Sequence, residues 1–133
     1  MVDINKVGGL WVREKRLLVV KKKGLEALIS LGGKVEPGET ELDCLDRECL
    51  EETGRKARVI GYFGAFEGRT IDQAKTIKQS CYLIELDGEP VVNSKDSIEG
   101  FAWIERDYAS KGILLAPQLE KQIVPALIER GYL

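Results

Sequence analysis

The segment from Glu39 to Gly54 holds the residues of this sequence that are best suited to chemistry, because it concentrates carboxylates on a short stretch of chain. Seven of its residues are acidic and a single one, Arg47, is basic. The acidic residues are Glu39, Glu41, Asp43, Asp46, Glu48, Glu51 and Glu52. A helix turns by about 100° per residue, so the last three of these fall on one face of a helix.

Carboxylates gathered on one helix face repel each other, and a divalent cation relieves that repulsion. A donor set made only of oxygen atoms favours Mg²⁺, with Mn²⁺ as a substitute, over Zn²⁺. The alternative is a solvated acidic face on which Arg47 pairs with Glu51 four residues later. The spacing of the carboxylates alone leaves both interpretations open.

Seven residues around the acidic cluster stand in the register G-x5-E-x7-R-E-U-x-E-E-x-G, where U is an aliphatic position. They are Gly33, Glu39, Arg47, Glu48, Glu51, Glu52 and Gly54. This segment resembles the Nudix box, the signature of the Nudix hydrolase family. The resemblance favours the metal site over the solvated face, since a solvated face would not require the two glycines or Glu39.

The resemblance implies a role for each matching residue. The carboxylates of Glu48, Glu51 and Glu52 would hold the divalent metal, and Gly33 would offer it a backbone carbonyl. Arg47 would enter catalysis by orienting those carboxylates, with Glu39 as its structural partner, because metal ligands need fixing by the residues behind them. Gly54 would end the helix.

Three positions depart from the usual family pattern. The residue after Gly54 is Arg55 rather than an aliphatic residue, the aliphatic slot holds Cys49, and Leu31 replaces a frequent proline. None of these three residues is an expected metal ligand, so we expect activity to survive all of them.

The resemblance predicts Mg²⁺-dependent hydrolysis of a phosphoanhydride bond in a nucleoside diphosphate linked to another group. One carboxylate must accept the proton of the attacking water. Glu51 and Glu52 are the first candidates for this base, and Glu99 and Asp96 are alternatives on a later loop. The position that aligns best with the family's loop glutamate is Ser97.

Residues outside the box would decide the substrate. A nucleoside triphosphate or similar small nucleotide is favoured, while ADP-ribose and dinucleoside polyphosphates remain open. We expect Phe66 to stack on a base and Arg13 to meet phosphate. A different class of function, a nucleotide sensor without turnover, is disfavoured because such proteins usually lose box carboxylates, which are all present here.

The elements around the box indicate an α/β protein. Strands are expected at 7–12, 17–20, 27–29, 57–66, 77–86 and 101–104. Thr40 should cap a helix that ends at Gly54 and buries Leu42, Leu45 and Cys49 along one stripe. A second helix is expected at 117–130, kinked or split by Pro125. This order predicts an α/β sandwich with a mixed sheet between helices, and the resemblance implies that it is the Nudix-type α/β/α sandwich.

Composition narrows the function further. The chain has 133 residues, enough for a single domain spanning 1–133. It has no histidine, which excludes His-based zinc sites and Ser-His-Asp triads. Three unpaired cysteines and the lack of an N-terminal apolar stretch favour the cytoplasm. A net charge of −2 gives no reason to expect nucleic acid or a membrane as partner. By resemblance, a homodimer is possible.

Overall fold

A computed structural model of the chain describes residues 2–70, 72–92 and 97–133. The strands are β1 (Ile4–Leu10), β2 (Val12–Arg13), β3 (Arg16–Lys22), β4 (Leu31–Lys34), β5 (Ala57–Arg69), β6 (Thr76–Leu86) and β7 (Ile98–Ile104). The helices are α1 (Glu41–Thr53), the 3₁₀ helix η1 (Tyr108–Lys111), the π-helical turn η2 (Leu119–Ile123) and α2 (Val124–Glu129).

The strands form two sheets. The larger sheet has the order β4-β1-β6-β5, in which β1 and β6 run parallel while the outer pairs are antiparallel. The smaller sheet has the order β2-β3-β7 and is antiparallel. The prediction of a mixed sheet is therefore confirmed.

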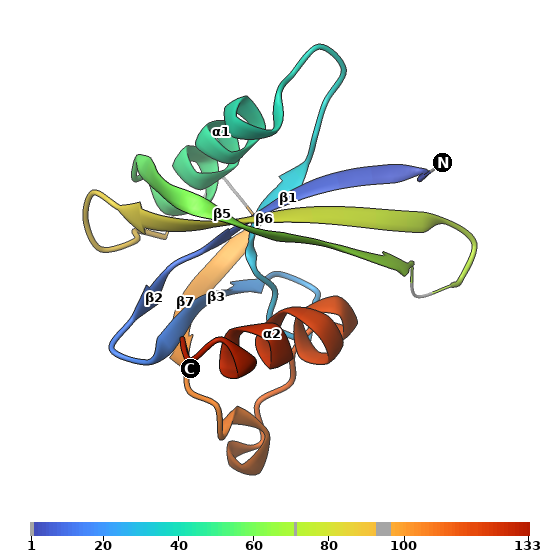
Figure 1. The fold of residues 1–133 in the computed structure, drawn as a ribbon. Helices are drawn as coiled ribbons and strands as arrows, with labels where there is room; N and C mark the ends of the chain where they lie inside the picture. Colours follow the sequence, from blue (N-terminus) through green and yellow to red (C-terminus); the bar gives the residue numbers. More distant parts are fainter. Residues whose placement is uncertain (1, 71, 93–96) are drawn as a thin grey trace.

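The larger sheet lies between the two main helices. Figure 1 shows α1 on one side of the sheet and α2 on the other. Each helix has its own hydrophobic core cluster: Leu45 and Cys49 of α1 belong to one, and Ile123 and Leu127 of the C-terminal helix to the other. The predicted α/β/α sandwich is confirmed.

The predicted boundaries of α1 are confirmed. The Thr40 side chain accepts a hydrogen bond from the Asp43 N–H, and the Asp43 side chain accepts one from the Thr40 N–H, which makes a capping box. Gly54 ends the helix with a φ of 70°, in the left-handed region that favours glycine. Both signals lie in the sequence within a few residues of where they act.

The predicted buried stripe of α1 needs correction. Leu45 and Cys49 are buried, but Leu42 is 46% exposed. Leu42 falls in the first turn of the helix, where it lies beyond the part that packs on the sheet. The stripe continues at Glu52, one turn after Cys49, and this residue is only 5% exposed. A carboxylate therefore lies on the buried face of the helix, where the hydrophobic pattern predicts apolar residues.

The C-terminal helix is split as the proline predicted. The Val124 N–H donates to the carbonyl of Leu119, five residues back, which is the π-helical pattern. Pro125 then falls in the first turn of α2, where its missing N–H costs no helix bond. The amides of Gln118 and Gln122 donate to the backbone carbonyls of Phe66 and Glu67 in β5.

One predicted strand is wrong. Residues 27–29 form two isolated bridges, Val20 with Ile29 and Leu28 with Leu115, rather than a continuous strand. The segment crosses between two neighbours, so it never runs alongside either one. The predicted strand at 7–12 is divided, because β1 ends at Leu10 and β2 begins at Val12, and β4 was not predicted. The other four predicted strands are present and longer than expected. Among the described residues, no helix is long and apolar enough to cross a membrane.

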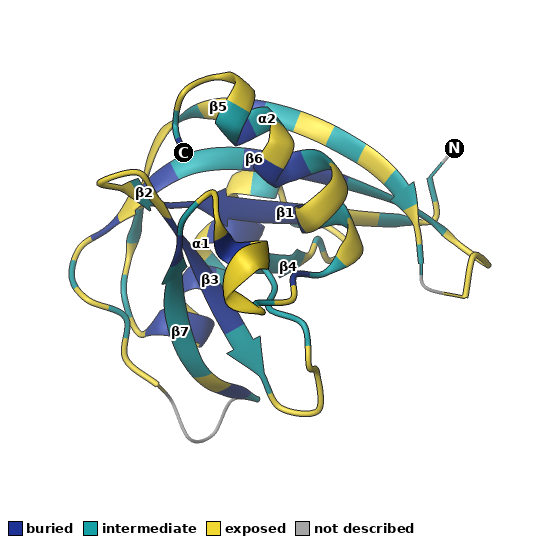
Figure 2. Cartoon of the chain, turned by 90° about the horizontal axis from the view of Figure 1, so that it is seen from below, coloured by how far each residue is buried: buried dark blue, intermediate teal, exposed yellow. Residues whose placement is uncertain are grey.

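Burial follows these layers. Figure 2 shows β5 alternating between exposed and half-buried residues, as expected for the outer strand of a sheet. In contrast β3 is buried over Leu17–Val20, because it lies in the middle of its sheet. The buried centre of the molecule thus includes β3 and the second half of β1. The first half of β1 contributes to the site described below.

Candidate metal and substrate site

A cavity of about 1100 Å³ opens beside α1. Its walls come from β1, β4, the second half of α1, the tip of the β5–β6 hairpin and the η2 turn. The expected metal ligands Gly33, Glu48, Glu51 and Glu52 all line it. The fold therefore brings these four residues to one cavity, although they come from two separate elements.

Arg47 ties the loop before α1 to the helix. Its Nε donates to Glu39 Oε2 at 2.7 Å and its Nη2 donates to Glu39 Oε1 at 3.0 Å. Its Nη1 donates to Glu48 Oε1 at 2.8 Å and lies 3.5 Å from Glu51 Oε2. Arg47 thus holds one expected metal ligand directly, as the orienting role requires, and its contact with Glu51 is the longer one.

Glu39 and Arg47 each stabilise the charged form of the other. The hydrogen bonds from Arg47, followed by the bond from the Glu36 N–H, lower the pKa of Glu39 to about 2. The same carboxylate raises the pKa of Arg47 above its already high ordinary value. Both groups are therefore charged at neutral pH, and the pair keeps its geometry without depending on a bound ion.

Glu48 packs directly against Gly33. A methyl group added at Gly33 would lie 2.5 Å from the Glu48 carboxyl carbon, so only glycine lets the chain pass so close to this carboxylate. The neighbouring Gly32 has a φ of 127°, and its N–H donates to Glu52 Oε1 at 2.8 Å. The two glycines of β4 thus contact two of the box carboxylates: Gly33 lies beside Glu48, and Gly32 donates to Glu52.

The donor set fits a hard divalent cation. Carboxylates and a backbone carbonyl are the oxygen ligands that Mg²⁺ takes in proteins. The three carboxylates are not drawn together into one point: within residues 2–70, 72–92 and 97–133, no three acidic or thiol groups form a ready cluster of ligands. They instead line one wall, so a cation there would share its coordination with water or substrate oxygens.

The thiol of Cys44 contacts the backbone at the end of β4. Its thiol donates to the carbonyl of Lys34 at 3.4 Å and approaches that of Gly33 at 3.8 Å. Burial, together with the nearby carboxylate of Glu39, raises the pKa of this thiol to about 12. Cys44 therefore remains a neutral donor and supplies no thiolate to the site.

Arg55, the first departure from the family pattern, has a structural explanation. Its Nε donates to the carbonyl of Glu89 at 2.7 Å, and its guanidinium packs on Gly88. The position therefore faces a surface turn rather than the hydrophobic core, so a long polar side chain fits where an aliphatic one is usual.

Several predicted site residues lie outside the cavity lining. Arg13 covers the rings of Trp11 and Trp103 and pairs with Glu89 at 2.7 Å. Phe66 packs with Phe63 against the hydrophobic core.

Of the two alternative bases on the later loop, Glu99 is exposed on β7 and does not line the cavity. Asp96 lies outside the described residues. Ser97, the position aligned with the family's loop glutamate, does line the cavity.

The structure adds residues that the sequence pattern missed. Lys6, Gln79, Gln118 and Gln122 all line the cavity. One signal could have pointed to two of them, because Gln118 and Gln122 are spaced by four residues on a helix face. Gln79 lies between Lys78 and Ser80 in a polar part of its strand and gives no such signal. Lys6 carries no such signal, since a lysine near the start of a strand is common.

A comparison with protein families matches residues 5–127 to the family described as NUDIX domain. Among curated proteins, an uncharacterized Nudix hydrolase of Nostoc sp. is 33% identical over 106 residues. These residues make up 76% of this chain but 59% of that protein, so the chain spans less than two thirds of its relative's length.

Solved structures share the fold. A MutT NUDIX hydrolase from Burkholderia pseudomallei gives a TM-score of 0.73 at 23% identity, over 96% of this chain and 97% of that one. A structure described as UDP-X diphosphatase gives a TM-score of 0.80 at 21% identity, over 100% of this chain and 66% of that one. At these identities the likeness carries the fold and leaves the substrate open.

Proposed function

This chain belongs to the Nudix hydrolase family, and on that premise we propose that it hydrolyses a phosphoanhydride bond in a nucleoside diphosphate linked to another group. The observation that carries the proposal is the single cavity lined by Gly33, Glu48, Glu51 and Glu52. A nucleoside triphosphate or similar small nucleotide remains the favoured substrate, with ADP-ribose and dinucleoside polyphosphates as alternatives.

The residues that line the cavity would have different roles in the reaction. Glu48, held by Arg47, and Glu52, held by the Gly32 N–H, would be the fixed ligands of a divalent cation. A divalent cation bound there would offset the charge that develops on the phosphate oxygens and make a water molecule more acidic. Lys6, which lines the same cavity, would add a positive charge toward the phosphates.

Glu51 is the carboxylate that we assign as the acceptor of the water proton. Its side chain is 55% exposed, whereas that of Glu48 is 18% exposed and Glu52 is buried. An acceptor must meet a water molecule and release the proton to solvent afterwards, and an accessible carboxylate does both.

The proposal is tested with purified protein, Mg²⁺ or Mn²⁺, and a panel of nucleoside triphosphates, ADP-ribose and dinucleoside polyphosphates. We expect cleavage of one substrate class, and a loss of roughly 100-fold or more in Glu52→Gln. Glu129→Gln, the same change on an exposed helix end outside the cavity, is the control. If one compound binds tightly and none is cleaved with either metal, the protein is a sensor and the enzymatic proposal is wrong.

A further inference from the structure

We propose that the cavity recognises a second phosphate group on its substrate, away from the cleaved diphosphate, and makes little use of a stacked base. The inference rests on the proposed function, because it concerns the part of the same substrate that does not react. Two features of the lining carry it: the placement of its cations and the chemistry of its remaining side chains.

The cations of the lining outnumber its carboxylates. Five lining residues are basic and four are acidic; the basic ones are Lys6, Lys22, Lys34, Arg69 and Lys121, and the acidic ones Glu48, Glu51, Glu52 and Asp72. Three of those carboxylates are the expected metal ligands. Once divalent cations are bound by them, the cavity is strongly positive, which suits a ligand with several negative charges.

The cations fall into two groups by element. Lys6 of β1 pairs in register with Lys34 of β4, and its charge interacts with Lys22, Glu52 and Glu48. This first group therefore belongs to the box. Arg69 and Lys121 come from the wall formed by the β5–β6 hairpin and η2, whose two parts are joined by the bond from Gln122 Nε2 to the Glu67 carbonyl.

Among the ion pairs between described residues, none involves Arg69 or Lys121. The Nη1 of Arg69 donates to the Gln73 carbonyl at 2.9 Å, at the tip of the same hairpin. Arg69 and Lys121 line the cavity on a different wall from the box ligands (the far wall), so they are placed to meet an anion of the substrate. A phosphate on the far part of the substrate is the anion that we infer.

The lining has no aromatic side chain. This holds for the described residues, and the others (1, 71 and 93–96) are also not aromatic in the sequence. Stacking on an aromatic ring is the usual way for a protein to hold a base. The cavity therefore has no ring with which to stack a base.

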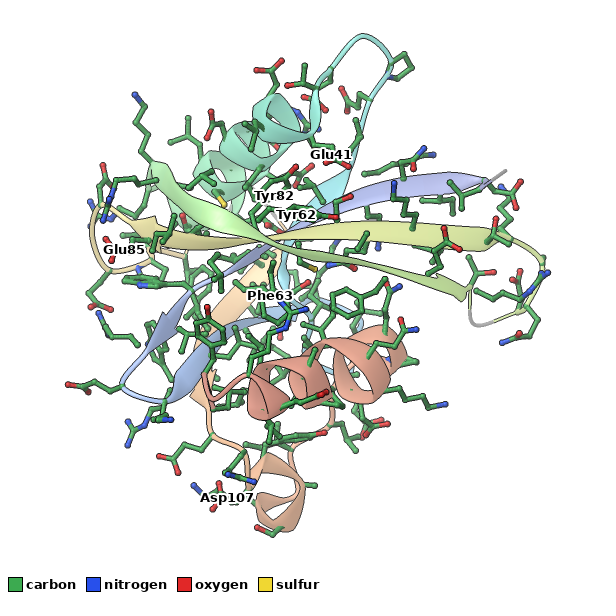
Figure 3. The ribbon with its side chains drawn as sticks, viewed as in Figure 1. Glu41, Tyr62, Phe63, Tyr82, Glu85 and Asp107 are labelled. Atoms are coloured by element: carbon green, nitrogen blue, oxygen red, sulfur yellow. The ribbon has the colours of Figure 1, made fainter. Side chains whose placement is uncertain are left out.

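All aromatic residues of the chain are engaged elsewhere. Figure 3 shows Tyr62 and Tyr82 on the side of the sheet that faces α1, near Glu41, and Phe63 on the side that faces α2. Tyr82 donates to Glu41, and Trp11 packs edge-on against Trp103. Phe66, Phe101, Tyr108 and Tyr132 belong to or pack against the two hydrophobic core clusters.

Side-chain amides rather than rings line the cavity. Gln118 Nε2 donates to the Phe66 carbonyl at 3.0 Å, and Gln79 Nε2 donates to the Ser30 hydroxyl at 3.0 Å. Gln122 Nε2 donates to the Glu67 carbonyl at 2.9 Å. A lining of amides suits the hydroxyls of a sugar or polyol, so the non-reacting part of the substrate would be a phosphorylated polyol.

Matched compounds that differ by one phosphate test the proposal. NADPH and NADH, and coenzyme A and dephospho-coenzyme A, each share a diphosphate and differ in a single phosphate monoester. 5-Phosphoribosyl 1-diphosphate carries a diphosphate and a separate phosphate without any base. We expect kcat/KM to be roughly 10- to 100-fold higher for the member with the extra phosphate, and the compound without a base to be cleaved as well as these.

Variants of the far wall show whether Arg69 and Lys121 are responsible. Arg69→Gln and Lys121→Gln should each reduce that preference, while kcat/KM for the member without the extra phosphate stays within about threefold. Lys56→Gln, the same change of charge at an exposed position outside the lining, should leave the preference unchanged. Equal rates for both members of each pair, or cleavage only of compounds that carry a base, would overturn the proposal.

Binding separates this inference from the proposed function. Dissociation constants for each pair are measured by calorimetry with Mg²⁺ on Glu51→Gln, which lacks the assigned proton acceptor, so that they do not depend on turnover. If no compound is cleaved but the phosphorylated member binds at least about tenfold tighter, the proposed function fails and the second phosphate site stands. If cleavage occurs and the affinities are equal, the proposed function stands and the second phosphate site is rejected.

Discussion

Arg47 and Glu39 are joined by two hydrogen bonds, at 2.7 and 3.0 Å, across the turn that leads into α1. The pair is a bidentate contact between a guanidinium and a carboxylate, the geometry in which arginine exceeds lysine. The same guanidinium also donates to Glu48, so the position of this expected metal ligand is linked to Glu39, nine residues earlier in the chain.

Arg47→Lys should keep the charge and lose this geometry. An ammonium group makes no planar fork, so Glu48 would no longer be held while Glu39 is held. We expect a loss of roughly 10- to 100-fold in kcat or in metal affinity, as is usual for residues that orient metal ligands. Steady-state kinetics and Mn²⁺ binding measure it, with Arg58→Lys at an exposed ion pair as the control. Unchanged values in both assays would show that Glu48 does not depend on Arg47.

The low pKa of Glu39 predicts an acid dependence of stability. Its folded pKa of about 2 lies below the ordinary value of 4.5, so its contribution is complete above pH 4.5 and is lost as the pH falls toward 2. Wild type should therefore exceed Glu39→Gln in free energy of unfolding at pH 6, and this difference should shrink by pH 2. Urea denaturation at several pH values measures it. A difference that does not change with pH would contradict the assignment.

Gly33→Ala should disturb the metal site without disturbing the fold. The new methyl group would lie 2.5 to 2.9 Å from the carboxyl atoms of Glu48, which must then move. We expect Mg²⁺ affinity to fall by roughly 10- to 100-fold. Calorimetric titration measures the affinity. Gly61→Ala is the matched control, because a methyl group there meets nothing within 4 Å. Equal affinities in both variants would mean that Glu48 is not a ligand.

Thr40→Ala should weaken α1 at its first turn. The Thr40 hydroxyl accepts the Asp43 N–H at 3.1 Å, and its removal leaves a helix donor without its cap. The expected cost is about 1 kcal/mol in the free energy of unfolding, measured by urea denaturation. Thr40→Ser keeps the oxygen and should recover most of it. If serine is as destabilising as alanine, the lost methyl group rather than the cap is responsible.

Local signals were enough to predict much of the fold. The start of α1 at Thr40, its end at Gly54 and the break at Pro125 each depend on residues within one helix turn, so the sequence alone determined them. The box register predicted four residues at one site, and the cavity does bring all four together. Such features follow from backbone geometry and spacing, which are properties of a short segment.

Other features were decided by tertiary structure. The burial of Glu52 in the apolar stripe of α1 follows from the Gly32 N–H that meets it, and that donor comes from a different strand. Phe66 and Arg13 carry side chains suited to nucleotide binding. In the structure, however, Phe66 stacks on Phe63 of the core, and Arg13 lies over the ring of Trp103. The second wall of the cavity brings Lys121 of η2 beside the hairpin that carries Arg69. These residues lie far apart in the sequence, so their contacts exist only once the sheet has formed between the two helices.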